Sequence, residues 1–493
     1  MMILAQAQLV FPQVSWMAIA PELVLSLGAA LILLIDVQWK PKTPRPLGIA
    51  FAVIILAALA FSVAQWIRLD TIPRDERFPF AGMIVVDGFG VLARSILFVV
   101  TGLAVAIGWN LFERLGRRAA EALALVALAA AGFSIMAVSL HLMLMFLGLE
   151  IGSIALYILA GITREHSESD EAAIKYFLLG SVASAIFIYG VALTFAGTGE
   201  LNVLEQARFM AENILFAPGV VLIGVALMVI GLAFKVSAAP FHSWAPDVYQ
   251  GAPAGAVGFM AAAAKVGAFV ALWRILGIGF PSLDDTWAPV IAAMAALSML
   301  VGAVLAVVQD DVRRMLAYSG VAHAGFILTG ILSGPEGIRG VWFYLAVYTL
   351  QLVGAFGVVA AVSGASGSRS AIAAFAGLGR RQPVLALVFS TLLLGMAGLP
   401  LTSGFIAKFG VFQDAWQAGF EWLVIVAVLT SVIGFFFYLR VIVAMYMQEP
   451  EGEQLPTPGI VARSALALVA VATIVFGVLP APLLELAGDA LSR

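Results

Sequence analysis

The sequence has no cysteine among its 493 residues. It therefore offers no disulfide, no thiolate ligand for an iron–sulfur cluster and no thiol nucleophile. It also lacks a Gly-rich loop ending in Gly-Lys-Ser/Thr, the motif that binds nucleoside triphosphates. These absences argue against ion pumping driven by ATP hydrolysis in this chain. Any electrons that flow nearby must be carried by another protein.

Charge is scarce as well. Only 11% of the residues are charged, whereas soluble domains have about 25%. The net charge of -3 shows no basic bias toward nucleic acid. Hydrophobic residues make up 62% of the chain and the mean hydropathy is +1.06. Because no soluble core absorbs so much apolar surface, the composition indicates a polytopic integral membrane protein.

The apolar runs predict an all-α integral membrane protein with about fourteen transmembrane helices. A helix needs about 20 apolar residues to cross the roughly 30 Å of hydrocarbon in a bilayer. Residues 1–20 lack the Lys/Arg-rich start of a cleavable signal peptide, so we expect the first span to be permanent. The expected spans are residues 17–37, 47–67, 82–108, 120–138, 141–162, 173–197, 218–238, 253–276, 287–308, 315–333, 338–363, 384–407, 421–446 and 459–488.

Lys and Arg are distributed unevenly over the loops between these spans. Fifteen lie on one side, Arg164 and Arg369 among them, and seven lie on the other. Loops rich in Lys and Arg face the cytoplasm, so the sequence predicts that both termini are periplasmic.

Four cations and one carboxylate fall inside the apolar runs: Arg94, Lys235, Lys265, Lys408 and Glu150. A charged side chain at the centre of a bilayer costs about 2.5 to 3.5 kcal/mol on insertion scales, so it marks a functional site by default. Each has a structural alternative. Glu150 could bond a neighbouring helix, and Arg94 could pair with the nearby Asp87 or snorkel toward the surface.

Two of the lysines stand beside predicted helix breaks. Lys235 precedes Pro240 by five residues, and the proline removes the backbone donor that would have bonded back near Val236. Lys408 follows GLPLTSGFIA, which also weakens a helix. Unwound backbone at depth is tolerated where it lines a cavity, as in transporters. The alternative for both is a lysine that snorkels from a helix end. Lys265 lies midway along its span, too deep to snorkel easily.

The chain has four histidines, His141, His166, His242 and His323. The first three lie at span ends or in loops, which disfavours haem ligation between spans. His323 lies in the tenth span, where it either extends a proton path or is a hydrogen-bonded packing residue. We expect the segment with His242, Trp244 and Asp247 to be an amphipathic turn with its aromatic side chains at the membrane interface.

The two broken, lysine-bearing spans are the seventh and the twelfth, which suggests a repeat of five helices. A five-helix unit starts and ends on opposite sides, so a direct copy must insert upside down. The expected organisation is an N-terminal three-helix segment (1–119), a first repeat with spans 4–8 (120–278), a second repeat with spans 9–13 (279–447) and a C-terminal helix (448–493).

Three long motifs occur in order: GLAFKVSAAPFHSWAPDVYQGAPA, QDDVRRMLAYSGVAHAGFILTG and GLPLTSGFIAKFGVF. Over roughly residues 80–445 the chain resembles the antiporter-like membrane subunits of respiratory complex I. Within that family, PDVYQGAP, lysine at 408 and the lack of a long C-terminal lateral helix favour the subunit N group, the counterpart of mitochondrial subunit 2. Arg313-Arg314 in place of Lys-Arg, and SGVAHAG around His323, depart slightly from the family pattern.

The resemblance implies roles for the buried charges in a hydrated proton path. Glu150 and Lys235 resemble the family's carboxylate–lysine pair, Lys265 its central lysine, and Lys408 the lysine of the second broken helix. The chain would be a translocase subunit of NADH:quinone oxidoreductase without a redox centre or metal of its own. Partner subunits would bind NADH, FMN, iron–sulfur clusters and quinone.

The implied setting is the bacterial inner membrane, where the chain would contact the lipid bilayer, protons and the other membrane subunits of complex I, and no nucleic acid. Two alternatives stay open. One is a subunit of a multisubunit cation/proton antiporter or a membrane-bound hydrogenase, which share the fold and the lysines. The other is an assembly scaffold that keeps its polar residues for packing.

Overall fold

The computed structural model describes residues 14–163, 167–213, 218–363, 370–450 and 457–493, so Arg164, His166 and Arg369 lie outside the described residues. The described chain is helical, apart from isolated bridges between pairs of residues. Its α-helices are α1 (Ala20–Trp39), α2 (Arg45–Arg68), α3 (Gly88–Ile107), α4 (Trp109–Leu115), α5 (Ala119–Val138), α6 (Leu142–Ala160), α7 (Ser167–Thr198), α8 (Val203–Glu212), α9 (Pro218–Val236), α10 (Trp244–Gly251), α11 (Ala254–Trp273), α12 (Asp284–Val307), α13 (Val312–Ile331), α14 (Gly334–Ser363), α15 (Leu378–Arg381), α16 (Pro383–Ala397), α17 (Ser403–Gln417), α18 (Glu421–Met447), α19 (Ile460–Val478) and α20 (Ala481–Ser492).

Twelve of the described helices are long and apolar enough to cross a membrane. This confirms the prediction of an all-α, multi-pass membrane protein. The twenty-residue α13 starts with two arginines in its first turn, and the fifteen-residue α16 is a shorter apolar helix. The total of fourteen spans stays a prediction.

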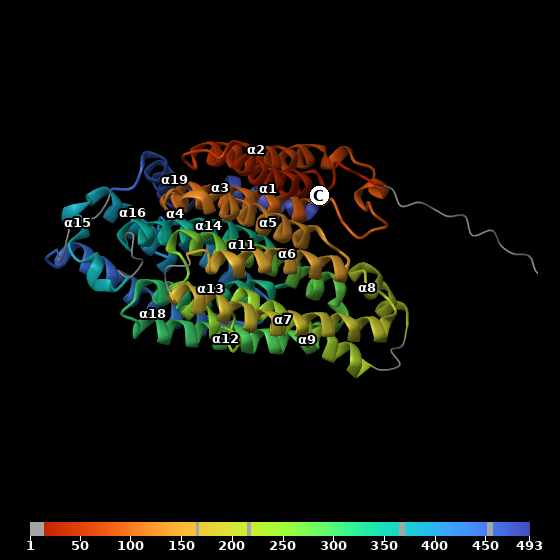
Figure 1. Cartoon of the computed structure of the whole chain (residues 1–493). Helices are drawn as coiled ribbons and strands as arrows, with labels where there is room; N and C mark the ends of the chain where they lie inside the picture. Colours follow the sequence, from red (N-terminus) through yellow and green to blue (C-terminus); the bar gives the residue numbers. More distant parts are fainter. Residues whose placement is uncertain (1–13, 164–166, 214–217, 364–369, 451–456) are drawn as a thin grey trace, which may run out of the picture.

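The long helices lie side by side in an elongated bundle, with α1 and α2 along one edge and α9 and α12 along the opposite edge (Figure 1). At the centre, α11 and α14 are almost entirely buried, whereas α1, α2 and α19 bury only about a third of their apolar stretches. The α11 sequence AGAVGFMAAAAKVGAFVALW explains its position, because small residues let neighbouring helices approach closely. The most buried helix therefore carries the predicted central lysine.

Both predicted breaks are present. Helix α9 ends at Val236 and the chain passes a cis Ala239–Pro240 bond before α10 begins. Helix α16 ends at Ala397, followed by Gly398 at φ +87°, and α17 begins five residues later. The left-handed conformation at Gly398 is one that glycine adopts without steric cost.

The same kind of local contact occurs once in each half of the chain. His141, which precedes α6, forms an isolated bridge with Asn202, after α7. Asp311, which precedes α13, forms one with Ala371, after α14. In each half the residue before the second helix thus pairs with the segment after the third. This recurrence agrees with two five-helix units, whose boundaries stay a prediction.

The C-terminal segment forms two helices where the sequence indicates one span. Helix α19 ends at Val478, and α20 begins after Pro480, which has no backbone N–H to continue α19. Helix α20 packs against α3 and α14, and Arg77 donates a 2.5 Å hydrogen bond to the carbonyl of Arg493. The C-terminus therefore lies beside the segment that follows α2.

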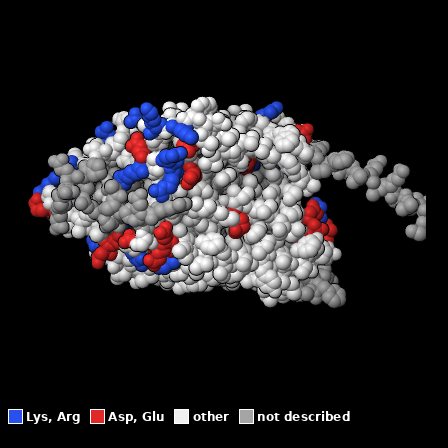
Figure 2. Space-filling view, in the orientation of Figure 1, with Lys and Arg blue, Asp and Glu red and all other residues white. Residues whose placement is uncertain are grey.

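Lys and Arg side chains gather at the end of the bundle that holds α15, while the middle is mostly white with few charged side chains (Figure 2). This distribution agrees with the unequal numbers of Lys and Arg in alternate loops of the sequence. An uncharged band between charged ends is the surface that a bilayer requires.

Candidate functional site

The first helix break exposes a backbone carbonyl to a buried lysine. Pro240 has no N–H to bond to Val236, four residues earlier, as the sequence predicted. The Val236 carbonyl instead accepts a 2.6 Å hydrogen bond from Lys265 Nζ, which comes from α11. The break thus supplies a polar partner at depth.

Lys265 joins the first broken helix to the second half of the chain. Its ammonium also donates to the Gly320 carbonyl on α13, at 3.2 Å, and the residue is only 1% exposed. Snorkelling to the surface is excluded for this lysine by its burial.

Lys408 repeats the arrangement at the second break. Its Nζ donates to the carbonyl of Ala397, the last residue of α16, at 2.9 Å, and to Ser431 Oγ on α18 at 2.7 Å. It also lies 4.9 Å from the ring centre of Phe326. Lys408 is buried and therefore does not snorkel.

His323 lies on α13 between these two lysines, in a buried cluster of hydroxyl groups. Its Nδ1 is 2.7 Å from the Tyr344 hydroxyl and its Nε2 is 3.3 Å from the Tyr438 hydroxyl. Tyr438 is also hydrogen-bonded to Ser319, and the His323 ring stacks on Tyr348 at 4.3 Å. Both ring nitrogens therefore have a partner that can donate or accept a proton.

Glu150 and Lys235 lie on neighbouring helices, α6 and α9, without forming a direct ion pair. Within the described residues, neither Glu150 Oε1 nor Lys235 Nζ has a hydrogen-bond partner, although both atoms are buried. A buried charged group without a partner is costly, so native structures keep few of them. The buried Lys235 ammonium is therefore a candidate functional group.

The hydroxyl groups around His323 were missed by sequence reasoning. Tyr344 and Tyr438 lie in long apolar helices, α14 and α18, where a tyrosine is an ordinary core residue. Only the packing of α14 and of α18 against α13 directs both hydroxyls at one imidazole. The single signal in the sequence was His323 itself.

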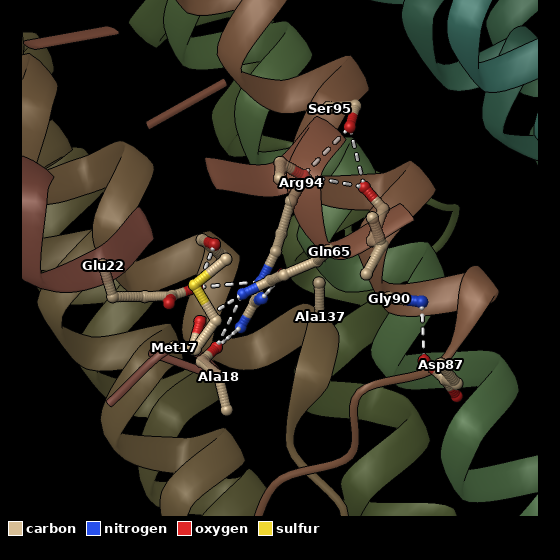
Figure 3. Close-up of polar contacts among 12 residues, drawn as sticks. Met17, Ala18, Glu22, Gln65, Asp87, Gly90, Arg94, Ser95 and Ala137 are labelled. Atoms are coloured by element: carbon tan, nitrogen blue, oxygen red, sulfur yellow. Dashed lines mark hydrogen bonds and ion pairs between the residues drawn. The ribbon is translucent and has the colours of Figure 1, made fainter. Parts of the chain in front are cut away.

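Arg94 belongs to a different cluster, shown in Figure 3. Its guanidinium bonds Glu22 at 2.9 Å, Gln65 at 2.7 Å and the Ala18 carbonyl at 3.1 Å. Glu22 also accepts a hydrogen bond from Ser134. These contacts tie α1, α2, α3 and α5 together. The structure therefore favours a structural role for Arg94 over a functional one.

Pairing with Asp87 was one of the alternatives left open for Arg94, and Arg94 pairs with Glu22 instead. Asp87 instead receives two hydrogen bonds from Arg274, at 3.0 and 2.8 Å, and caps α3 through Gly90 N. Arg274 lies near the end of the expected span 253–276 and is only 1% exposed, and the chain continues from it as a π-helical turn. Sequence proximity did not identify the partner, because the helices bring distant residues closer.

The segment after Pro240 also differs from its prediction. Trp244 and Tyr249 on α10 are each 3% exposed and pack in the core, so their rings contact protein rather than lipid. Trp244 Nε1 donates to the Phe234 carbonyl at 3.0 Å, which satisfies the end of α9. Trp244 therefore serves the end of the broken helix rather than contact with lipid.

Asp247, on the same segment, lies at the Lys/Arg-rich end of the bundle. It bonds Lys175 of α7 at 2.9 Å and Arg314 of α13 at 2.7 Å, and it lines an open cavity of about 210 Å³. Partial burial raises the pKa of this carboxyl, but the hydrogen bonds from Arg314 and Lys175 hold it below its ordinary value. Asp247 thus fastens α10 to helices from both halves of the chain.

The arrangement forms a chain of polar groups through the bundle. The half-buried Glu150 and the buried Lys235 stand at one end, and Lys265 bonds the carbonyl of Val236, the residue after Lys235. From there it continues along α13 to His323, and Phe326 lies against Lys408 beyond it. No metal-binding group of three or more His, Cys, Asp or Glu occurs among the described residues. The chemistry that these groups offer is transfer of protons.

Comparison with known proteins identifies the family of this chain. Residues 139–434 match the family described as NADH:quinone oxidoreductase/Mrp antiporter, TM. NADH-quinone oxidoreductase subunit N of Salinispora arenicola is 40% identical over 98% of this chain and 99% of its own length. The chain belongs to the subunit N family. The Mycobacterium tuberculosis subunit N is 46% identical over 77% of this chain and 72% of its own length.

Solved structures show the same fold. A chain of respiratory complex I from Thermus thermophilus with bound aureothin superposes with a TM-score of 0.78, at 32% identity, over 94% of this chain and 98% of its own. A chain of the Mrp complex from Dietzia has a TM-score of 0.83 at 21% identity, over 97% of both chains. The second likeness concerns the fold alone.

Proposed function

We propose that this chain is a proton-translocating membrane subunit of NADH:quinone oxidoreductase in a bacterial inner membrane. It assembles with the other membrane subunits of complex I, and quinone reduction elsewhere in the complex drives it. Glu150, Lys235, Lys265, His323 and Lys408 carry the proton path. The observation that carries the proposal is the pair of helix breaks, each of which presents a carbonyl to a buried lysine.

The two breaks belong to two inverted five-helix units, residues 120–278 and 279–447. Each unit contributes a broken helix, a buried lysine and a hydrogen-bonded carbonyl. In transporters with inverted repeats, ion sites lie near the bilayer midplane where helices are discontinuous. The buried axis of this chain has that character.

Proton transfer along this axis follows from the surroundings of each lysine. Burial disfavours a charged ammonium, whereas a nearby carboxylate favours it, so a change in the distance between Glu150 and Lys235 changes proton affinity. Moving one proton against the membrane potential takes about 2.3 kcal/mol per 100 mV. One pKa unit corresponds to about 1.4 kcal/mol, so switching by a few units is of the required size.

The chain itself is expected to carry no electrons. NADH, FMN, the iron–sulfur clusters and quinone are bound by partner subunits, and this chain supplies the proton path. Purified alone and reconstituted in vesicles, it should not oxidise NADH. Quinone-coupled NADH oxidation without partner chains would contradict this assignment.

The proposed path is tested with Glu150→Ala and Lys235→Ala in the assembled complex. Each variant leaves its partner buried without an opposite charge, so proton translocation per NADH should fall while assembly is retained. Lys42→Ala, at an exposed loop lysine, is the matched control and should pump normally. Normal pumping by both axis variants would instead indicate an assembly scaffold.

A further inference from the structure

The ammonium of Lys235 faces a pair of tyrosine rings that contact each other. Its Nζ is 5.3 Å from the ring centre of Tyr157 on α6 and 5.4 Å from that of Tyr176 on α7. Both distances are within the range of cation–π attraction, which is stronger where water is excluded. Lys235 is 3% exposed, so this condition is met.

The rings are held in place by their neighbours. Tyr157 meets Tyr176 edge to face at 4.7 Å, and Tyr176 stacks on Trp244 at 4.6 Å. Gly180 on α7 makes the space for Tyr157, because a Cβ at that position would overlap the tyrosine hydroxyl. The two ring positions are therefore built into the packing of α6, α7 and α10.

The ring faces, rather than the hydroxyl of Tyr157, are what this site offers to the lysine. Lys235 Nζ makes no hydrogen bond within the described part of the chain. A buried ammonium without a hydrogen bond needs another source of stabilisation. Two electron-rich faces at about 5 Å supply it.

Few other charged or titratable groups are near Lys235. Glu150 on α6 is the nearby carboxylate and acts on the lysine electrostatically. On the side of α11, Lys265 bonds the carbonyl of the adjacent residue, Val236, and its charge opposes that of Lys235. Two different groups thus stabilise the protonated form of Lys235: the Glu150 carboxylate and the pair of tyrosine rings.

We propose that Tyr157 and Tyr176 form an aromatic cage that holds the protonated side chain of Lys235 while it is separated from Glu150. The cage rests on the proposed proton path, in which Lys235 is alternately close to and apart from its carboxylate. Without the cage, the separated ammonium would have no partner and would lose its proton early. The two tyrosines are positioning residues for Lys235.

The test is proton translocation per NADH, measured across a range of pH in vesicles with equal amounts of assembled complex. Tyr176→Phe keeps the ring face and should pump as the unmodified protein does. Tyr176→Leu removes the ring face, so the protonated form of Lys235 is less stable. The alkaline limb of the pH profile should then move to lower pH by about one unit. Tyr189→Leu, at a 60% exposed tyrosine on the same helix, should leave the profile unchanged.

A series of increasingly fluorinated phenylalanines at position 176 separates ring electrostatics from packing. Fluorine weakens the negative ring face with little change in volume, so the cage requires a graded shift of the profile along the series. An unshifted profile in the series or in Tyr176→Leu overturns the cage. Lys235→Ala is measured in parallel: normal pumping there overturns the proton path itself, whereas lost pumping with an unshifted Tyr176→Leu profile overturns the cage alone.

Discussion

At the scale of single residues, the protein stabilises two buried lysines with carbonyls that helix breaks expose. Lys265 takes the carbonyl that Pro240 leaves unbonded, and Lys408 takes the carbonyl at the end of α16. A carbonyl accepts a hydrogen bond from an ammonium without holding it in the charged form. A carboxylate at short distance would hold it in that form. Both lysines can therefore be held in place and still release a proton.

Lys408 is expected to need basicity more than bulk. Lys408→Met should keep the packing volume and remove the charge, and Lys408→Arg should keep the charge permanently, because a guanidinium does not release its proton. Both variants should lower proton translocation per NADH at equal levels of assembled complex. Pumping at the level of the unmodified protein from the Arg variant would show that position 408 does not titrate.

Asp247 is expected to stabilise the protein in a pH-dependent way. Its pKa is held below the ordinary value by Arg314 and Lys175, so its contribution is present above the unfolded-state pKa, about 3.9, and is lost as pH falls through the lower folded-state pKa. Asp247→Asn should cost about 1 kcal/mol or less near neutral pH, because the pairs are partly exposed.

Thermal unfolding of the purified chain in detergent, followed at several pH values, measures this effect. The unmodified protein and Asp247→Asn should differ near pH 7 and converge in acid. Glu421→Gln, at an exposed carboxylate in the first turn of α18, serves as a control at the protein surface. A difference for Asp247→Asn that persists unchanged in acid would mean that its carboxylate charge is not the cause.

At the scale of helices, the hairpin of α1 and α2 is fastened to the bundle by a polar cluster rather than by apolar packing alone. Both helices bury only about a third of their apolar stretches. Arg94 joins Glu22 of α1 and Gln65 of α2 from α3, inside the bundle. In a bilayer, lipid competes with helix packing, so a buried ion pair gives these helices a defined position.

Breaking this cluster should loosen the hairpin. Arg94→Met leaves Glu22 buried without an opposite charge, and loss of one partner of a buried pair costs about 3 to 5 kcal/mol. The double variant Glu22→Gln/Arg94→Met should cost less than the sum of the single variants. Thermal unfolding of all four proteins gives the coupling. Additive effects would show that the two side chains do not depend on each other.

At the scale of the whole molecule, the charge distribution orients the protein. Lys and Arg gather at one end of the bundle (Figure 2), and the C-terminus lies beside the segment after α2, away from the α1–α2 loop. The positive-inside rule places the charged end in the cytoplasm. We therefore predict that the C-terminus faces the periplasm.

The absence of cysteine makes this orientation directly measurable. A single cysteine at an exposed site on each end, Ser492→Cys or Lys42→Cys, can be labelled with a membrane-impermeant maleimide in spheroplasts. Ser492→Cys should react in intact spheroplasts, and Lys42→Cys only after permeabilisation. The reverse pattern would invert the topology.

The sequence by itself determined the class of the protein and the identity of its buried charges. Scarce charge and long apolar runs require a bilayer, and Pro240 and Gly398 mark the breaks beside Lys235 and Lys408. These are local properties, because insertion cost and the loss of a backbone donor depend on neighbours along the chain.

Only the tertiary structure decided the partners of those charges. Arg94 bonds Glu22 rather than the adjacent Asp87, Lys265 bonds a carbonyl of another helix, and Lys235 faces tyrosines of two more. Such contacts join residues far apart in the chain, and they depend on which helix faces pack together. Helices that are apolar all round carry no periodic pattern that reveals their inward face, so the sequence could not supply these partners.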